Sequence, residues 1–316
     1  MPASAAGLRF DLALAAALPQ YSRARLQRWI ASGAVLLEGR MVRPRARLSG
    51  GEQVRVEAEF TPDRTVTAEA IALRIVYEDE AFLVVDKPAG MVVHPGAGNG
   101  AHTLQNALLA HDAALALVPR AGLIHRLDKD TSGLLIVART PETHHVLVRM
   151  LQDRAITRSY LALCLGRPTA GGTIDEPIGR HRSQRTRMTV RSDGREAVTH
   201  YRIEERFRGH TLLRVQLETG RTHQIRLHLA HQKYPIAGDP VYGGRFAQPR
   251  DASENLVVTL RAFKRQALHA ASLGLNHPRT AKRLSLQAPV PGDFRQLLLA
   301  LRDDARAAAP APRRAR

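Results

Sequence analysis

The sequence predicts an α+β protein in which a small basic domain precedes a larger domain of strands and helices. Three observations support this fold class. A chain of 316 residues is long enough for one large domain and a small one. Residues 8–59 contain two helical patterns and short apolar strands, whereas residues 72–302 alternate between strand and helix patterns. The 47 Lys and Arg residues exceed the 29 Asp and Glu residues, which gives a formal net charge of +18.

The excess positive charge indicates a polyanionic partner such as nucleic acid, because each phosphate that is neutralised releases condensed counterions. The alternative is compositional drift toward Arg and Ala, which are frequent throughout the chain. The single cysteine, Cys164, excludes an internal disulfide and a zinc site of several cysteines. No apolar run approaches the ~20 residues of a membrane helix and no signal peptide is recognisable, so the sequence predicts a soluble, cytoplasmic protein that does not bind membranes.

The small domain is expected to begin with two helices. Leucines at helical spacing predict the first of them: Leu8, Leu12, Leu14 and Leu18. Ser22 is a suitable N-cap for the second helix, which is expected to end at Gly33. The apolar face of this second helix is predicted to consist of Leu26, Trp29 and Ile30.

Basic side chains are concentrated in two parts of the small domain. The second helix is expected to expose Arg23, Arg25 and Arg28. Short strands are expected at residues 35–37, 39–40 and 54–56, with a basic hairpin that carries Arg40, Arg43, Arg45 and Arg47. A rigid helix beside a basic hairpin suits contact with phosphates, and the alternative is a solvated basic face without a ligand.

Residues 60–71 are predicted to be a linker, and residues 72–302 a mixed domain of strands and helices. Strands are expected at 73–77 and 82–86, as a hairpin, and at 134–139, 156–165, 197–204 and 211–218. Helices are expected at 104–109 and after Thr140, where a cap, a proline and a first-turn acid follow one another. Residues 303–316, rich in Ala, Pro and Arg, are expected to be a disordered tail.

The densest polar cluster in apolar surroundings covers residues 125–133, His-Arg-Leu-Asp-Lys-Asp-Thr-Ser-Gly. It lies between Leu123–Ile124 and an apolar strand, and a loop pinned between buried segments is a rigid platform for a catalytic carboxylate. Asp128, which lies between two cationic residues, is the candidate for that role. The alternative is an ordinary turn in which an acidic side chain such as Asp130 caps backbone groups.

A second polar cluster covers residues 219–228, Thr-Gly-Arg-Thr-His-Gln-Ile-Arg-Leu-His. It follows a strand and is expected to begin a helix that Thr222 caps. A zinc site is weakly supported, because one helical face does not carry all of His223, His228 and His231. An arginine turned inward from the first helical turn is better explained as the partner of a carboxylate or phosphate.

Two further features are less specific. Tyr160 lies in a strand pattern, and from the pattern alone a core position with the hydroxyl at its rim is favoured. Residues 86–96 form a loop shaped by Pro and Gly after a strand, which is consistent with the rim of a binding site.

Several segments together resemble the RluA-type pseudouridine synthases. Residues 123–139, Leu-Ile-His-Arg-Leu-Asp-Lys-Asp-Thr-Ser-Gly-Leu-Leu-Ile-Val-Ala-Arg, resemble the catalytic motif of that family. Residues 86–90 resemble its upstream motif, and residues 220–226 with 238–243 its downstream one. The small domain, residues 8–59, resembles the S-four type RNA-binding domain found in front of some members.

The resemblance implies a pseudouridine synthase fold for the large domain, with a mixed and mostly antiparallel sheet. It implies that Asp128 is the catalytic aspartate, that Arg226 is its salt-bridge partner, and that Tyr160 packs against the target base, which reverses the reading from pattern alone. Whether Arg226 or Arg221 pairs with Asp128 stays open at this point, because both lie in one motif. Candidate RNA contacts are Arg126, which resembles the arginine that fills the space of the flipped nucleotide, with His125, Arg221, His223, Arg23, Arg25, Arg28 and Arg40.

The activity implied is conversion of uridine to pseudouridine in a stem-loop of 23S rRNA at the subunit interface, with 23S rRNA or the large ribosomal subunit precursor as the partner. A monomer is the default expectation. The reaction needs no cofactor and no metal, since product and substrate are isomers. Extruding the base costs a few kcal/mol, and stacking on an aromatic ring returns ~1–3 kcal/mol. The carboxylate must be ionised, which a paired guanidinium favours. The competing hypothesis is a non-catalytic RNA-binding ribosome assembly factor, and a metal-dependent nuclease is a more distant one.

Overall fold

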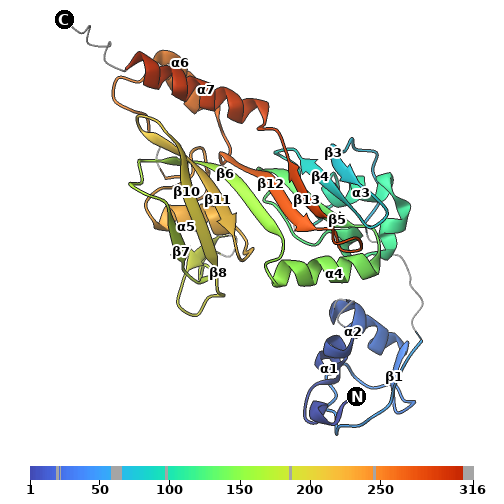
Figure 1. The fold of residues 1–316 in the computed structure, drawn as a ribbon. Helices are drawn as coiled ribbons and strands as arrows, with labels where there is room; N and C mark the ends of the chain where they lie inside the picture. The colour runs from blue at the N-terminus through green and yellow to red at the C-terminus, as the bar shows by residue number, and fades with distance from the viewer. Residues whose placement is uncertain are drawn as a thin grey trace, which may run out of the picture.

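The computed structural model of the chain describes residues 1–18, 21, 23–57, 66–96, 99–184, 187–244 and 247–308. Figure 1 shows two bodies, the small N-terminal domain in blue and the large domain that contains all other elements. Among the described residues, none of the helices combines the length and apolarity that crossing a lipid bilayer requires.

One nine-stranded sheet organises the large domain, in the order β3-β4-β5-β12-β6-β11-β10-β7, with β13 paired to β12. The strands are β3 Ile75–Glu78, β4 Phe82–Lys87, β5 Ser132–Ala138, β6 Thr157–Leu165, β7 Gly172–Asp175, β10 Val198–Arg206, β11 His210–Leu217, β12 Leu268–Asn276 and β13 Arg283–Gln287. Only the β5–β12 pair is parallel among the described strand pairs. The sheet is therefore mixed and mostly antiparallel, which confirms the predicted fold class.

Both faces of the sheet are covered around β4 and β5, which explains why these strands are continuously apolar rather than alternating. Leu83 and Val85 pack into the larger core with side chains of α3 (Leu104–His111), whereas Phe82 and Val84 pack into a second core that includes Leu147 of α4 (Pro141–Gln152). The predicted start of α4 is confirmed, since the Thr140 side chain accepts a hydrogen bond from the Thr143 amide.

The remaining helices and a short hairpin complete the large domain. These elements are α5 Gln224–His231, α6 Glu254–Ala262, α7 Gly292–Ala307, the 3₁₀ turns η2 Ala113–Leu117 and η3 Pro119–Gly122, and the two-stranded sheet of β8 Ile178–Arg180 and β9 Met188–Val190. The segment 66–71 lies against α3, where Glu69 donates its amide to the carbonyl of Asn106. Residues 60–65 of the predicted linker lie outside the described residues.

The small domain has a hydrophobic core of its own. Its elements are η1 Ala3–Ala5, α1 Phe10–Ala17, α2 Arg23–Ser32, β1 Val35–Leu37 and β2 Val54–Val56. The predicted apolar face of α2 is confirmed, since Leu26, Trp29 and Ile30 are buried. Ser22, the expected cap of α2, lies outside the described residues.

Three local predictions are wrong. Residues 39–40 form no strand, since Arg40 makes only an isolated bridge with Leu37, whereas the strands predicted at 35–37 and 54–56 are confirmed and pair antiparallel, with the basic residues in their connection. Arg25 is buried at 8% exposure instead of facing solvent. The predicted disordered tail begins too early, because α7 continues to Ala307 and buries Asp304, which accepts hydrogen bonds from Arg208 and the amide of Ser253.

Candidate active site

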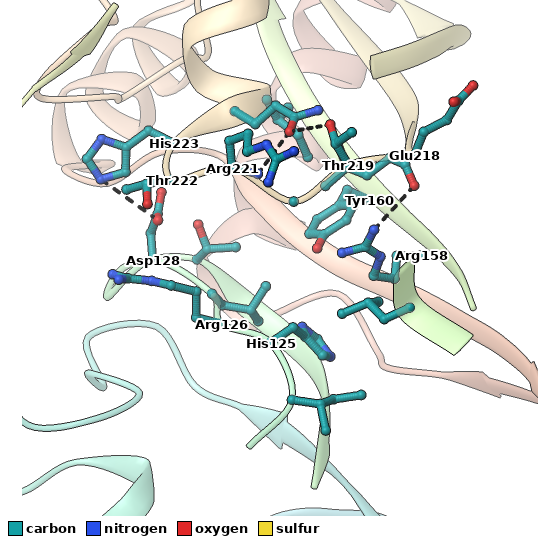
Figure 2. A pocket seen from close by; sticks show the side chains of 18 of the residues that line it. His125, Arg126, Asp128, Arg158, Tyr160, Glu218, Thr219, Arg221, Thr222 and His223 are labelled. Atoms are coloured by element: carbon teal, nitrogen blue, oxygen red, sulfur yellow. Dashed lines mark hydrogen bonds and ion pairs between the residues drawn. The ribbon is translucent and has the colours of Figure 1, made fainter. Parts of the chain in front are cut away.

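A cavity of about 520 Å³ opens between the loop before β5, strand β6 and the segment after β11 (Figure 2). The loop before β5 is held from several sides. The buried ammonium of Lys87 donates to the carbonyl of Lys129, Arg265 donates to the carbonyl of Asp130, and Gln266 donates to the hydroxyl of Thr131. The loop that carries Asp128 is thus a rigid platform, as its position between buried segments predicts.

Asp128 lies at the cavity wall with its carboxylate beside one guanidinium. Arg226 Nη1 donates to Asp128 Oδ2 at 2.9 Å, and the Asp128 side chain is 15% exposed. The Nε2 atom of His223 lies 3.8 Å from Asp128 Oδ1. A carboxylate that is paired but still reachable from the cavity can act on a bound molecule as a nucleophile or as a proton acceptor.

Arg226 reaches Asp128 from α5 because a second carboxylate holds its other edge. Its Nε and Nη2 atoms donate to the two oxygens of Asp239 at 2.7 and 2.8 Å. Burial opposes the charge of Arg226, but the hydrogen bonds to Asp239 and the charges of Asp239 and Asp128 raise its pKa above the ordinary value. Arg226 therefore stays cationic and presents one fixed N–H group to Asp128.

Asp239 is in turn fixed by the backbone. Its Oδ1 accepts the amides of Val241 and Tyr242 at 2.8 and 3.0 Å. Burial opposes its ionisation, but the hydrogen bonds from Arg226 and from these amides lower the pKa of Asp239. Hydrogen bonds thus connect the backbone to Asp239, Asp239 to Arg226, and Arg226 to Asp128. This series of contacts fixes the orientation of the guanidinium.

The helix α5 begins differently from the prediction. Its N-cap is His223, in the left-handed conformation with φ of 58° and without a side-chain cap, so Thr222 does not cap the helix. The Gln224 side chain instead accepts the Arg221 amide and donates to the carbonyl of Val198. This arrangement turns His223 back toward the cavity, where burial lowers its pKa and favours the neutral ring.

Two aromatic side chains lie beside the Asp128–Arg226 pair. Tyr160 on β6 lines the cavity with its ring (Figure 2), and burial raises its pKa, so the hydroxyl is neutral. The ring of Tyr242 lies 5.3 Å from the Arg226 guanidinium, and its hydroxyl is 3.0 Å from His223 Nδ1. Tyr160 thus offers a flat surface to the cavity, while Tyr242 supports the cationic side of the site.

The other predicted residues of the large domain are distributed around the cavity. Arg126 is exposed at the mouth, and Arg221 lines the wall but directs its Nε to the carbonyl of Glu196. His125 accepts the amide of Ile136 on its Nε2 atom, and burial together with the charge of Arg158 lowers its pKa to about 3. His125 is therefore neutral and fixed to β5 rather than a mobile cation.

The predicted arginines of the small domain differ from one another. Arg28 and Arg40 are exposed, Arg25 is buried, and Arg23 is 45% exposed while it pairs with the buried Asp11 at 2.8 Å. Exposed loop arginines add to this surface, namely Arg43, Arg45 and Arg47. Arg28 and Arg40 are therefore free to meet an external anion, whereas Arg25 is not.

Two site residues were missed by reasoning on isolated clusters. Asp239 and Tyr242 lie in the segment 238–243, whose resemblance to a family motif was the only signal for them. The zinc reading has no geometric support, since both ring nitrogens of His228 are within hydrogen-bond distance of Thr199 and Glu176. In the part of the chain that the structure describes, no group of three or more His, Cys, Asp and Glu side chains could hold a metal.

Comparisons with known proteins show the family of the chain. A family model described as RNA pseudouridylate synthase matches residues 81–231, and a model of the S4 domain matches residues 8–54. The chain is 54% identical over 314 residues to ribosomal large subunit pseudouridine synthase D of Xanthomonas campestris, which covers 99% of this chain and 95% of the relative. It is 53% identical over 304 residues to the protein of the same name from Pseudomonas aeruginosa, covering 96% and 95%, and 51% identical over 299 residues to that of Escherichia coli K12, covering 94% and 92%.

Solved structures resemble the fold. The human RNA pseudouridylate synthase domain containing 4 protein matches with a TM-score of 0.57 at 24% identity, over 72% of this chain and 93% of that one. The human RNA pseudouridylate synthase domain containing 1 protein matches with a TM-score of 0.53 at 25% identity, over 78% and 98%.

Proposed function

The chain belongs to the RNA pseudouridylate synthase family, and from that premise we propose that Asp128 isomerises an extruded uridine of large-subunit ribosomal RNA to pseudouridine. Pseudouridine synthase activity follows from the family and from relatives that share over half of their residues with this chain. The roles of individual residues are our proposal, and they rest on the geometry of the cavity.

The observation that carries the proposal is the Asp128–Arg226 ion pair at the wall of a basic cavity. Six arginines line this cavity, namely Arg120, Arg126, Arg154, Arg158, Arg221 and Arg226. A polyanion is drawn toward such a surface. The carboxylate of Asp128 then meets the nucleotide among these arginines, whereas the other two acidic side chains of the lining, Glu196 and Glu218, are paired with Arg154.

The reaction breaks the bond between ribose C1′ and uracil N1 and forms a bond between C1′ and C5. The C5 proton leaves and N1 gains a proton, so atoms and electrons balance within the substrate and water. Attack of Asp128 on the sugar, attack on the base, and removal of a ribose proton all require one ionised carboxylate beside the nucleotide. Arg226 supports that ionised form, since it offers Asp128 a charge-assisted hydrogen bond.

Tyr160 is proposed to bind the extruded nucleotide, and Arg126 is proposed to fill the space that this nucleotide leaves in the RNA. The Tyr160 ring faces the cavity and offers a stacking surface, which is worth ~1–3 kcal/mol per base. Arg126 is exposed at the mouth, where it can enter the space that the uridine leaves. Together these contacts offset the few kcal/mol that extrusion costs.

The small domain is proposed to bind the same RNA through exposed arginines such as Arg28 and Arg40. We propose that the enzyme acts as a monomer, because the carboxylate, the arginine that pairs with it and the stacking tyrosine all come from one domain of one chain. We propose that it works in the cytoplasm, the compartment in which bacterial ribosomes are assembled. The name of its relatives refers to the large ribosomal subunit, and we propose 23S rRNA as the substrate.

The experiment that tests this function is a map of pseudouridines in 23S rRNA from cells with and without the protein. Loss of specific pseudouridines in the deletion strain, and their return when purified protein is incubated with that RNA, is the expected result. An unchanged map would leave the chain as an RNA-binding assembly factor and would overturn the proposal.

A further inference from the structure

We propose that Arg158 forms a phosphate subsite of the cavity, in which its guanidinium binds one phosphodiester group next to the target uridine. This inference rests on the proposed function and extends it, because the ion pair at Asp128 and the stacking surface of Tyr160 leave Arg158 without a role. It concerns a buried residue of the cavity wall rather than the exposed arginines of the mouth.

The first observation is a buried cation without an acidic partner. Arg158 is 7% exposed, and among the described residues no carboxylate oxygen lies within 4 Å of its guanidinium. Its only hydrogen bond to a described residue is a long one, from Nη2 to the carbonyl of Leu217 at 3.5 Å. A buried guanidinium is costly in free energy unless an anion and further hydrogen bonds complete it.

The nearby carboxylates are already occupied by other groups. Glu218 pairs with Arg154 and with His200, and Glu196 also pairs with Arg154. Figure 2 shows the Glu218 side chain directed away from Arg158. Arg158 is thus a buried cation of this wall that the described carboxylates leave unpaired, and we infer that an external anion completes it.

The second observation is that one donor of the guanidinium is left uncovered. Arg158 Nη1 lies 3.0 Å from the position that a Cβ atom on residue 220 would take, so a side chain there would crowd this atom, whereas Gly220 leaves it uncovered. The Nε atom is fully buried without a partner, whereas Nη1 has no acceptor among the described residues and is not fully buried. Nη1 is therefore the donor that a ligand in the cavity can reach.

The third observation is the position of Arg158 on β6. Residues 158 and 160 are two apart on one strand, so both side chains point to the same face, and both line the cavity (Figure 2). A base stacked on Tyr160 carries phosphates on its own ribose and on the next one. A phosphate oxygen is an anionic acceptor that suits a guanidinium, so we choose the phosphate over the neutral carbonyl groups of uracil as the ligand.

The test uses the full-length protein and an rRNA fragment that contains one mapped target uridine labelled with tritium at C5. Single-turnover tritium release against protein concentration separates the half-saturating concentration from the maximal rate. For Arg158→Gln, we expect the half-saturating concentration to rise about ten- to a hundredfold, with a much smaller change in the maximal rate. The slope of the logarithm of the half-saturating concentration against the logarithm of the salt concentration should fall by about one for Arg158→Gln. The variant Arg158→Lys should recover most of the lost affinity.

The decisive comparison removes the charge from the RNA instead of the protein. Each phosphodiester near the target is replaced in turn by an uncharged methylphosphonate. A methylphosphonate at one position should weaken binding to the unaltered protein. The same substitution should not affect binding to Arg158→Gln, because this variant has already lost the arginine that contacts the phosphate. Arg306→Gln is the matched control, because it removes the same charge from an exposed position of α7 and should change neither quantity.

Equal half-saturating concentrations for Arg158→Gln and the unaltered protein would overturn the proposed subsite. So would a methylphosphonate scan in which no substitution has an effect that depends on Arg158. If Arg158→Gln does not fold, the scan on the unaltered protein and on Arg158→Lys decides, and a scan without any sensitive linkage contradicts the proposal. Absence of tritium release from the unaltered protein would instead contradict the proposed function, so the two failures are distinguishable.

Discussion

At the scale of single residues, the site depends on which arginine contacts Asp128. Arg226 makes the 2.9 Å contact, whereas Arg221 directs its Nε to the carbonyl of Glu196. We therefore expect Arg226→Ala to lower the single-turnover rate of pseudouridine formation at least about a hundredfold, the effect of leaving a partly buried charge unpaired. Arg221→Ala should weaken RNA binding with a smaller effect on the maximal rate.

Both variants are compared by tritium release at saturating protein, with circular dichroism as a check of folding. Asp239→Asn gives an intermediate test, because it removes the charge that holds the other edge of Arg226 while Arg226 itself remains. An inactive Arg221→Ala beside a normal Arg226→Ala would contradict this assignment.

A second residue-level prediction concerns His210, which is buried at 1% exposure. Neither of its ring nitrogens has a hydrogen-bond partner among the described residues, and burial lowers its pKa to about 4. The unfolded chain, with a histidine pKa of about 6.5, takes up a proton as the pH falls from 6.5 to 4, whereas the folded protein does not. The free energy of unfolding is therefore highest above pH 6.5 with respect to His210, and it falls as the pH falls from 6.5 toward 4.

The variant His210→Leu removes this titration. As the pH falls from 6.5 to 4, the free energy of unfolding of His210→Leu should increase relative to that of the unaltered protein, by about 1.4 kcal/mol per pH unit. Urea unfolding of both proteins at several pH values measures the difference. Parallel stability curves from pH 7 to pH 4 would show that the His210 ring is protonated in the folded state.

Sequence reasoning found the residues that meet at the site but not all of their contacts. Asp128 stands out because a polar loop interrupts buried segments, and this needs no knowledge of the fold. The choice between Arg226 and Arg221 depends on the left-handed turn at His223, and the role of Asp239 depends on a contact across thirteen residues. Arg25 was misjudged because helical periodicity gives a face but not what packs against it.

At the scale of elements, the junction of β5 with the loop that carries Asp128 requires a glycine. Gly133 has φ of 112°, and a Cβ atom there would lie 2.2 Å from the carbonyl oxygen of Ala270 on β12. Residues 132–133 of β5 pair in parallel with residues 269–270 of β12, so backbone would have to move to make room. We expect Gly133→Ala to destabilise the protein by ~3 kcal/mol or more.

The matched control is Gly292→Ala at the start of α7. Gly292 has no atom within 4 Å of its Cβ position and no positive φ, so the change should be within ~1 kcal/mol and favourable. Thermal and urea unfolding of the two variants measure both effects. A Gly133→Ala protein as stable as the unaltered one would mean that β5 and β12 separate easily at this point.

Elements with a clear period or a clear cap were predicted well. Strand β11 alternates and α4 has a cap, a proline and an acid, and both were confirmed. Strand β12 was missed, although it lies between β5 and β6, because it is covered on both faces and contains small residues, so no alternation marks it. Helix α7 was not predicted, and the disordered tail was placed too early, at residue 303, because Ala and Arg are common both in tails and in helices.

At the scale of the whole molecule, the net charge is +18, and arginines gather at two places in the described residues, the cavity and the small domain. The cavity of the large domain is where we propose that the nucleotide binds, and the small domain, with a core of its own, carries exposed arginines. The fold class followed from strand and helix patterns, but the order of the strands did not, because the parallel β5–β12 pair joins segments more than a hundred residues apart.

Neutralising the small domain should therefore weaken binding without changing chemistry. We expect the replacement of Arg28, Arg40, Arg43 and Arg45 by Gln to lower the log–log salt slope of RNA binding by about 0.7–0.9 for each arginine that contacts a phosphate. The maximal single-turnover rate should stay the same. A control protein with Gln at four exposed positions elsewhere, Arg279, Lys282, Arg295 and Arg306, should retain the slope, and an equal loss in both proteins would mean that only total charge matters.

The central claim is that one carboxylate, at position 128, carries the chemistry, and tritium release from rRNA labelled at C5 of uridine measures it directly. We predict that the unaltered protein releases tritium and forms pseudouridine, while Asp128→Asn binds the same RNA with similar affinity and releases none. Appreciable tritium release by folded Asp128→Asn protein would contradict the claim, because an amide can neither attack the nucleotide nor accept its proton.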